Sequence, residues 1–211
     1  MSKQHQSIRI FKNDYLENLT HVHPLTPLIM WGPFAVWMIW RALMVHSLSV
    51  WMIASVGICG FLAWTLVEYG AHRFIFHITE NGKLDGTFVE RFQYVMHGLH
   101  HDDPVDATRL VLPPAPAAAF AIIFYSIFIQ ILGPVWVEPF FAFFLIGYLC
   151  YDYIHFAVHH FKPMTPVGRY LKQVHMIHHF VNPKSHWGVS SPLWDYVFGT
   201  LESPKSVEHG S

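Results

Sequence analysis

Four long apolar stretches dominate the pattern of hydrophobic and polar positions along this chain. They cover residues 27–45, 48–67, 115–132 and 135–151. The charged residues inside them are Arg41, near the end of the first, and Glu138, near the start of the fourth. A helix that crosses a membrane needs about 17–25 predominantly apolar residues. The pattern therefore predicts an all-α integral membrane protein with four transmembrane helices.

The connections between paired stretches are very short. His46–Ser47 joins the first pair and Gly133–Pro134 joins the second pair. Such short links predict two helical hairpins whose tips face the same side of the membrane. The N-terminus and the segments 68–113 and 152–211 would then lie together on the opposite side.

The distribution of basic residues predicts which side that is. Of the thirteen Lys and Arg residues, only Arg41 lies near a hairpin tip, and the other twelve lie in the segments on the opposite side. Because cytoplasmic loops carry an excess of Lys and Arg, we expect those segments to be cytoplasmic. The first fifteen residues contain no apolar run, so we expect no cleaved signal peptide.

Composition agrees with a membrane protein of one domain. Hydrophobic residues make up 53% of the 211 residues and charged residues only 13%, whereas a soluble domain has about 25% charged residues. The length predicts a single domain over residues 1–211. A formal net charge of −1 gives no indication of a nucleic-acid partner. Cys59 and Cys150 lie in apolar stretches, and we expect no disulfide between them.

Clustered histidines are the main chemical signal. Eleven of the seventeen histidines fall into four short clusters, all in the two predicted cytoplasmic segments. The clusters are His72 and His77; His97, His100 and His101; His155, His159 and His160; and His175, His178 and His179. Neutral imidazole is the commonest metal ligand in proteins. One ion takes roughly four to six ligands, so this number of histidines predicts two ions close together.

The spacing within the clusters predicts how they bind. Histidines three or four residues apart share one helix face and can aim at one ion. His72 and His77 are five apart, so we expect them to serve different ions. Carboxylates are sparse, but Glu68, Asp102 and Asp152 are close enough in sequence to accept a ring N–H and fix a tautomer.

Three uses of such a site remain open from the residues alone. The site could activate oxygen against an acyl chain, hydrolyse a lipid with zinc-bound hydroxide, or pass metal ions. A transport path would need ligands inside the spans, and the four apolar stretches contain no histidine. The clusters also contain no cysteine, which argues against a structural zinc–thiolate site.

Five segments carry a resemblance to known proteins. They are Glu68–His77, His97–Pro114, Gly147–His155 together with His159, Leu171–Phe180, and Gly188–Thr200. On these segments the chain is similar to the fatty acid hydroxylase superfamily of membrane dimetal oxygenases, and within it to the fatty acid 2-hydroxylases that act on sphingolipid acyl chains. The resemblance extends from about Glu68 to Thr200, in the family's order.

The resemblance implies a set of ligands and cofactors. It implies ten metal ligands, with His160 outside the set: His72, His77, His97, His100, His101, His155, His159, His175, His178 and His179. It implies O2 as a cosubstrate. It also implies two iron ions in the working enzyme, because zinc has no redox chemistry and cannot activate oxygen. Zinc is expected as a possible occupant of the purified protein. Eukaryotic relatives often carry an N-terminal haem domain. We expect none here, and a separate electron-transfer protein of the cytochrome b or ferredoxin type instead.

The implied reaction is hydroxylation of a long acyl chain at carbon 2, in a free fatty acid or a ceramide-like lipid. The alternatives are a sphingoid-base C4-hydroxylase, a sterol or carotenoid hydroxylase, and a membrane zinc protein without enzymatic activity. Substrate contacts are expected at Tyr69, Arg109, Tyr151, Lys172 and Trp187. His186 is expected at the surface or in a substrate lid. The expected location is a bacterial inner membrane or, in a eukaryote, the endoplasmic reticulum.

Overall fold

Helices are the only regular secondary structure in the part of the protein that the structure, a computed structural model, describes: residues 7–79 and 83–202. This confirms the prediction of an all-α chain. The α-helices are α1 (Asp14–Asn18), α2 (Thr26–Met44), α3 (Val50–Ala71), α4 (Phe88–Gln93), α5 (Leu99–Asp102), α6 (Pro114–His160), α7 (Pro166–Phe180) and α8 (Leu193–Phe198), and two π-helical segments are η1 (His72–Phe76) and η2 (Tyr94–Gly98).

Local sequence signals explain where several helices begin. Ser49 precedes α3, and its hydroxyl accepts a hydrogen bond from Met52 N at 3.3 Å. Thr165 caps α7 in the same way, accepting from Gly168 N at 3.0 Å. Side-chain oxygens at these positions satisfy backbone N–H groups that have no partner inside the helix.

Helix α6 consists of two antiparallel arms. Gly133 interrupts its helical backbone with φ 73° and ψ 172°, a conformation that glycine adopts without steric cost. The ring centroids of Phe124 and Phe144 lie 5.3 Å apart, whereas twenty residues of straight helix would separate them by roughly 30 Å. The chain therefore reverses at Gly133, at the tip predicted for the second hairpin.

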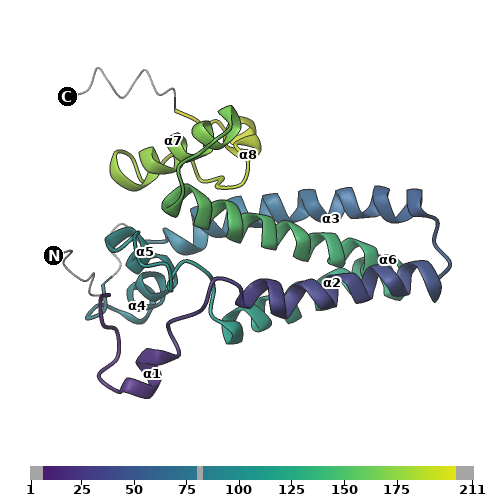
Figure 1. The fold of residues 1–211 in the computed structure, drawn as a ribbon, viewed down its shortest axis with the longest axis horizontal. Coiled ribbons are helices and arrows are strands. Elements are labelled where there is room, and N and C mark those ends of the chain that lie inside the picture. Colours follow the sequence, from purple (N-terminus) through teal and green to yellow (C-terminus); the bar gives the residue numbers. More distant parts are fainter. Residues whose placement is uncertain (1–6, 80–82, 203–211) are drawn as a thin grey trace.

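Within the described residues, three helices are long and apolar enough to cross a membrane: α2, the continuous helical stretch Val50–Phe76, and the two-armed α6. They lie side by side along the long axis of the molecule, and α1, α4, α5, α7 and α8 gather at one end, away from the α2–α3 connection (Figure 1). The four predicted apolar segments are thus four helical arms. Four membrane crossings remain a prediction.

The two hairpin tips are joined by an ion pair. Arg41, near the end of α2, donates to Glu138 Oε1 through Nε at 2.9 Å, and a second guanidinium nitrogen lies 2.8 Å from the same oxygen. His46 Nε2 lies 3.3 Å from Glu138 Oε2. Glu138 is only 5% exposed. The two charged residues that interrupt the apolar stretches therefore neutralise each other.

Close packing of α3 on α6 fixes where the histidines at their ends lie. A Cβ at Gly60 would lie 2.0 Å from Phe140 O, so only glycine permits this backbone approach. Small residues at helix contacts allow such crossings in membrane proteins. Because α3 leads into His72 and α6 carries His155 and His159, this packing brings ligand-bearing segments of both halves to one end of the molecule.

Candidate metal centre

Ten histidines gather into two compact groups, and they are the ten that the family resemblance implies as ligands. In each group, one candidate ligand atom from every residue lies within 4.8 Å of all the others. The first histidine group contains His72, His77, His97, His101 and His178, and the second histidine group contains His100, His155, His159, His175 and His179. His160 belongs to neither. Rings of the two groups meet where His101 stacks on His179, with centroids 4.1 Å apart.

Each His-x2-His-His cluster is divided between the two groups. His97 and His101, four residues apart, point into the first group, while His100 points into the second. His175 and His179 point into the second group, while His178 points into the first. Around an α-helix the position four residues on lies about 40° to one side of the first residue, whereas the position three residues on lies about 60° to the other side, so the two positions point about 100° apart. The expectation that either spacing aims at one ion holds only for the spacing of four.

The prediction that His72 and His77 serve different ions is wrong. Both belong to the first group, with ring centroids 5.2 Å apart. The reason is the π-helical segment η1, which begins at His72 and ends just before His77. Hydrogen bonding from i to i+5 widens each turn, so residues five apart come to one face.

The Nε2 atoms of the histidines converge in a way that fits a cation. In the first group, the Nε2–Nε2 distances are 3.0 Å for His72–His97, 2.9 Å for His97–His101 and 3.2 Å for His77–His178. In the second group, they are 2.9 Å for His100–His155 and 2.8 Å for His159–His175. Two nitrogens bound at about 2.1 Å to one ion and at right angles to each other lie roughly 3 Å apart.

The tautomers of two rings make the same point. His72 Nδ1 lies 2.6 Å from Trp187 O, and His178 Nδ1 lies 2.8 Å from Ser185 O. Because a carbonyl oxygen can only accept, both rings carry hydrogen on Nδ1 and present the Nε2 lone pair to the group. Lone pairs directed at one another repel unless a cation lies among them. The donor set therefore fits metal ions.

Burial keeps the ligands in the metal-binding form. Desolvation lowers the pKa of His77 to about 4 and the pKa of His101 to about 3. His175 and His178 are almost completely buried, and burial also lowers their pKa values. Imidazole binds metal as the neutral base, so these rings are available as ligands at neutral pH.

The predicted outer carboxylates are placed differently from expectation. Glu68 accepts hydrogen bonds from the backbone N–H groups of Val189 at 2.8 Å and Ser190 at 2.7 Å, and from the Ser190 hydroxyl, rather than from His72. Asp102 accepts from Tyr94 OH at 2.8 Å. Asp152 Oδ2 is buried and has no hydrogen-bond partner among the described residues other than Tyr148. The Nδ1 atoms of His72 and His178 are hydrogen-bonded to backbone carbonyls and not to carboxylates.

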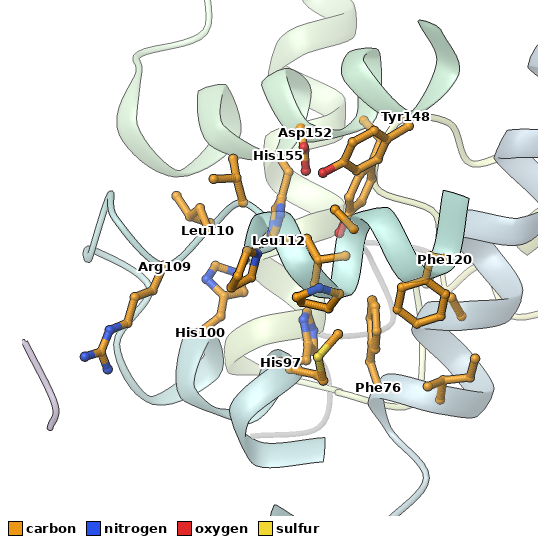
Figure 2. A pocket seen from close by; sticks show the side chains of 18 of the residues that line it. Phe76, His97, His100, Arg109, Leu110, Leu112, Phe120, Tyr148, Asp152 and His155 are labelled. Carbon is orange, nitrogen blue, oxygen red and sulfur yellow. Dashed lines mark hydrogen bonds between the residues drawn. The ribbon is translucent and has the colours of Figure 1, made fainter. Parts of the chain in front are cut away.

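A cavity of about 640 Å³ opens beside both groups. His97, His100 and His155 line it and point into its interior (Figure 2). Its lining includes apolar side chains of the spans and, from the N-terminal segment, Ile10, Phe11, Leu16 and Leu19. The cavity is mostly apolar, and it therefore suits a hydrocarbon chain.

Two polar side chains break the apolar lining next to His155. Tyr148 OH and Asp152 Oδ2 are buried, interact with each other and have no other hydrogen-bond partner among the described residues. Their oxygens face each other in Figure 2. Buried polar groups normally have partners, so this pair is suited to hold a polar group of a molecule in the cavity. The sequence analysis missed Tyr148, which shares a helix face with Asp152 four residues later.

Of the predicted substrate contacts, Arg109 and Tyr151 line the cavity, whereas Tyr69, Lys172 and Trp187 are not among its lining residues. The Arg109 guanidinium points away from the histidines (Figure 2). It donates to Ile8 O and Glu17, and it lies 2.8 Å from His21 Nε2. Its charge is used to fasten the N-terminal segment over the cavity.

His186 is expected at the surface or in a substrate lid, and the surface position is wrong. It is 1% exposed, and its φ of 56° is in the left-handed region that non-glycine residues rarely adopt. It lies between Ser185 and Trp187, whose carbonyl oxygens bind His178 and His72. The sequence carries no side-chain signal for these contacts, because the groups that make them belong to the backbone.

Comparison with known proteins gives consistent matches. The fatty acid hydroxylase family profile matches residues 57–200. A dihydroceramide fatty acyl 2-hydroxylase of Arabidopsis thaliana is 36% identical over 198 residues, which cover 94% of this chain and 81% of the plant protein. The ceramide very long chain fatty acid hydroxylase of Saccharomyces cerevisiae is also 36% identical, and the match covers 94% of this chain and 50% of the yeast protein.

A solved structure shares the fold. The structure of full-length Scs7p, in which only the hydroxylase domain is visible, superposes with a TM-score of 0.83 at 35% sequence identity, covering 90% of this chain and 71% of that chain. The fatty acid 2-hydroxylase of Mus musculus is 35% identical over 92% of this chain and 56% of the mouse protein. The similarity thus extends well beyond the histidine clusters.

Proposed function

Because this chain belongs to the fatty acid hydroxylase family, we propose that it is a membrane lipid hydroxylase that adds a hydroxyl group at carbon 2 of a long acyl chain, free or amide-linked in a ceramide-like lipid. The observation that carries the proposal is the juxtaposition of two five-histidine groups with one apolar cavity. Relatives named as acyl 2-hydroxylases support the position of the hydroxyl.

The ten histidines would hold two metal ions, five to each histidine group. When bound, a pair of iron ions supplies the oxygen-activating chemistry that zinc, without redox chemistry, cannot supply. The chain's contribution is to hold neutral imidazoles in fixed tautomers. We assign no other protein residue a catalytic role.

The cavity would determine which carbon reacts. Carbon–hydrogen bonds along an acyl chain are chemically alike, so selectivity depends on where the lipid is held. Tyr148 and Asp152 would bind the carbonyl end or the head group, because their oxygens are buried, have no partner among the described residues except each other, and lie beside His155. The tail would extend along Phe120, Phe124 and Phe144 between the spans. This pose puts the carbon next to the carbonyl nearest the histidines.

The proposed hydroxylation needs electrons that the histidines cannot supply. One atom of O2 enters the product and the other leaves as water, which consumes two electrons and two protons. We propose a separate electron-transfer protein of the cytochrome b or ferredoxin type as their source. Oxygen uptake with purified protein, lipid and a chemical reductant should match the hydroxylated product mole for mole.

We propose that all four helical arms cross the membrane and that the histidine-bearing end is cytoplasmic, within a single domain over residues 1–211. The support is the position of twelve of thirteen basic residues on that side. The membrane would be the bacterial inner membrane or the endoplasmic reticulum. A reporter fused after Ser211 should be active only in the cytoplasm. Activity on the periplasmic or lumenal side would contradict this topology.

The test of the activity is the position of the hydroxyl group. Lipids from a host lacking hydroxylated acyl chains would be fragmented by mass spectrometry with and without this chain. We expect 2-hydroxyacyl lipids only when the chain is present. Hydroxylation of a sphingoid base, a sterol ring or the methyl end of the acyl chain would contradict the proposed position but leave the hydroxylase assignment intact. No hydroxylated lipid at all would contradict both.

A further inference from the structure

The segment Ser185–Ser190 connects two buried carboxylates to two ligand rings. Its first part supplies the carbonyl oxygens that bind His178 and His72. Its last part donates backbone N–H groups to Glu68. Between them, Asp195 accepts from the backbone of Trp187 and Gly188. The histidines are therefore held by a piece of backbone that is itself held by carboxylates.

One peptide unit of this segment is bound at both ends. Gly188 N donates to Asp195 Oδ2 at 2.7 Å, and Trp187 O, in the same peptide unit, accepts from His72 Nδ1 at 2.6 Å. The N–H and C=O of a trans peptide lie in one plane and point in opposite directions. Fixing the N–H therefore fixes the direction of the carbonyl and, through it, the ring of His72.

Asp195 is anchored well enough to act this way. It is 1% exposed, and its Oδ1 accepts from Trp187 N at 2.8 Å and from Thr200 Oγ1 at 2.7 Å. A Cβ at Gly188 would lie 2.1 Å from Ser191 O and 2.9 Å from Asp195 Oδ2, so only glycine fits there. A fully hydrogen-bonded carboxylate in a dry interior polarises the groups bonded to it.

We propose that Asp195 is a positioning residue for the first histidine group: through the Trp187–Gly188 peptide it orients His72 and strengthens the hydrogen bond to its outer nitrogen. The arrangement is a carboxylate–peptide–imidazole chain, in place of a carboxylate bonded directly to a ligand ring. The proposal rests on the proposed metal binding. Its consequence is that Asp195, which touches no ligand side chain directly, controls how firmly the ion of the first histidine group is held.

The test variant is Asp195→Asn in the full-length, metal-loaded protein. Asparagine keeps an oxygen that can accept from Trp187 N, but its amide nitrogen cannot accept from Gly188 N. We measure release of each metal ion to excess chelator by elemental analysis over time. Loss of an outer hydrogen-bond partner typically weakens metal binding about 10–100-fold. We expect one ion to leave faster by about that factor and the release of the other ion to be unchanged.

The matched control is Glu138→Gln. Like Asp195, Glu138 is a buried carboxylate, but it is ion-paired with Arg41 and lies at the hairpin tips, far from both histidine groups in the fold. This substitution should lower the unfolding temperature without changing the release of either ion. Equal acceleration of both ions by Asp195→Asn, no acceleration, or the same selective acceleration in Glu138→Gln would overturn the proposal. Wild-type protein that holds fewer than two ions would instead contradict the proposed function.

A second variant covers the case in which Asp195→Asn fails to fold. Thr200→Val removes one hydroxyl donor to Asp195 but keeps its backbone bond, in which Thr200 N donates to Asp195 O at 2.8 Å. We expect a smaller acceleration for the release of a single ion. Unchanged release of both ions from folded Thr200→Val protein would overturn the proposal.

Discussion

The first and second histidine groups are built from corresponding segments of the two halves of the chain, yet their outer ring nitrogens are held differently. In the first, His72 and His178 donate to backbone carbonyls. In the second, the Nδ1 atoms of His155, His175 and His179 are buried without hydrogen-bond partners among the described residues. The two groups therefore have equal numbers of histidines but different numbers of hydrogen bonds to the ring nitrogens that face away from the group. This matters because such a hydrogen bond fixes the tautomer and orientation of a ligating ring.

The largest effects should come from the histidines that cross between the halves. His178→Ala removes a ligand that the second half contributes to the first group, and His100→Ala does the reverse. Each variant should lose hydroxylase activity and one bound metal ion, measured by lipid mass spectrometry and elemental analysis. An active His178→Ala protein that still holds two ions would show that His178 is not a ligand.

Removal of metal by a chelator should distinguish the groups by rate. The second group, with fewer outer hydrogen bonds, should release its ion about 10–100-fold faster than the first. His159→Ala removes a ligand of the second group and should abolish the fast phase while leaving the slow phase in place. Two ions released at one rate, or a slow phase that disappears in His159→Ala, would contradict the ranking.

Changes at the polar end of the cavity should affect the lipid and not the metals. Asp152→Asn replaces the carboxyl group beside His155 while keeping the shape of the side chain. A hydrogen bond inside a protein is worth about 0.5–1.5 kcal/mol, so product formation at limiting lipid should fall about two- to tenfold. Metal content should stay at the wild-type value. Normal kinetics with full metal content would exclude Asp152 from lipid binding.

The smallest effect should follow from His160→Ala. His160 is adjacent to His159 but lies outside both histidine groups. Substitutions away from such a site usually change stability by no more than about 0.5 kcal/mol, so both ions should stay bound and activity should stay within about twofold of wild type. An effect as large as that of His178→Ala would place His160 in the ligand set.

The sequence was informative about the long helices because membrane spans are specified by composition. The four apolar stretches correspond to four helical arms, and Gly133 marks the reversal within α6. The resemblance identified the histidines that lie in the two groups, but spacing alone assigned His72 and His77 incorrectly. A local change from α- to π-helical hydrogen bonding alters which residues share a helix face, and no residue type in the sequence predicts where that change occurs.

The support around the groups was the least predictable part. Glu68 was expected to contact His72, but it binds the backbone at Val189 and Ser190 instead. Contacts made by the carbonyls of Ser185 and Trp187 depend on the path of the chain and not on side-chain chemistry. Position 188 has room only for glycine, so the glycine in the sequence is a local sign that the backbone is closely packed there.

The exchange of His100 and His178 between the histidine groups has a consequence for biosynthesis. The first half of the chain, which leaves the ribosome first, carries only four of the five ligands of its group. The fifth, His178, follows after both hairpins have been made. If each group binds one ion, as proposed, neither ion gains all five histidines until the last helices dock against the first. Metal binding would then require that the two halves of the chain have joined, and a chain truncated before His178 would leave both groups incomplete.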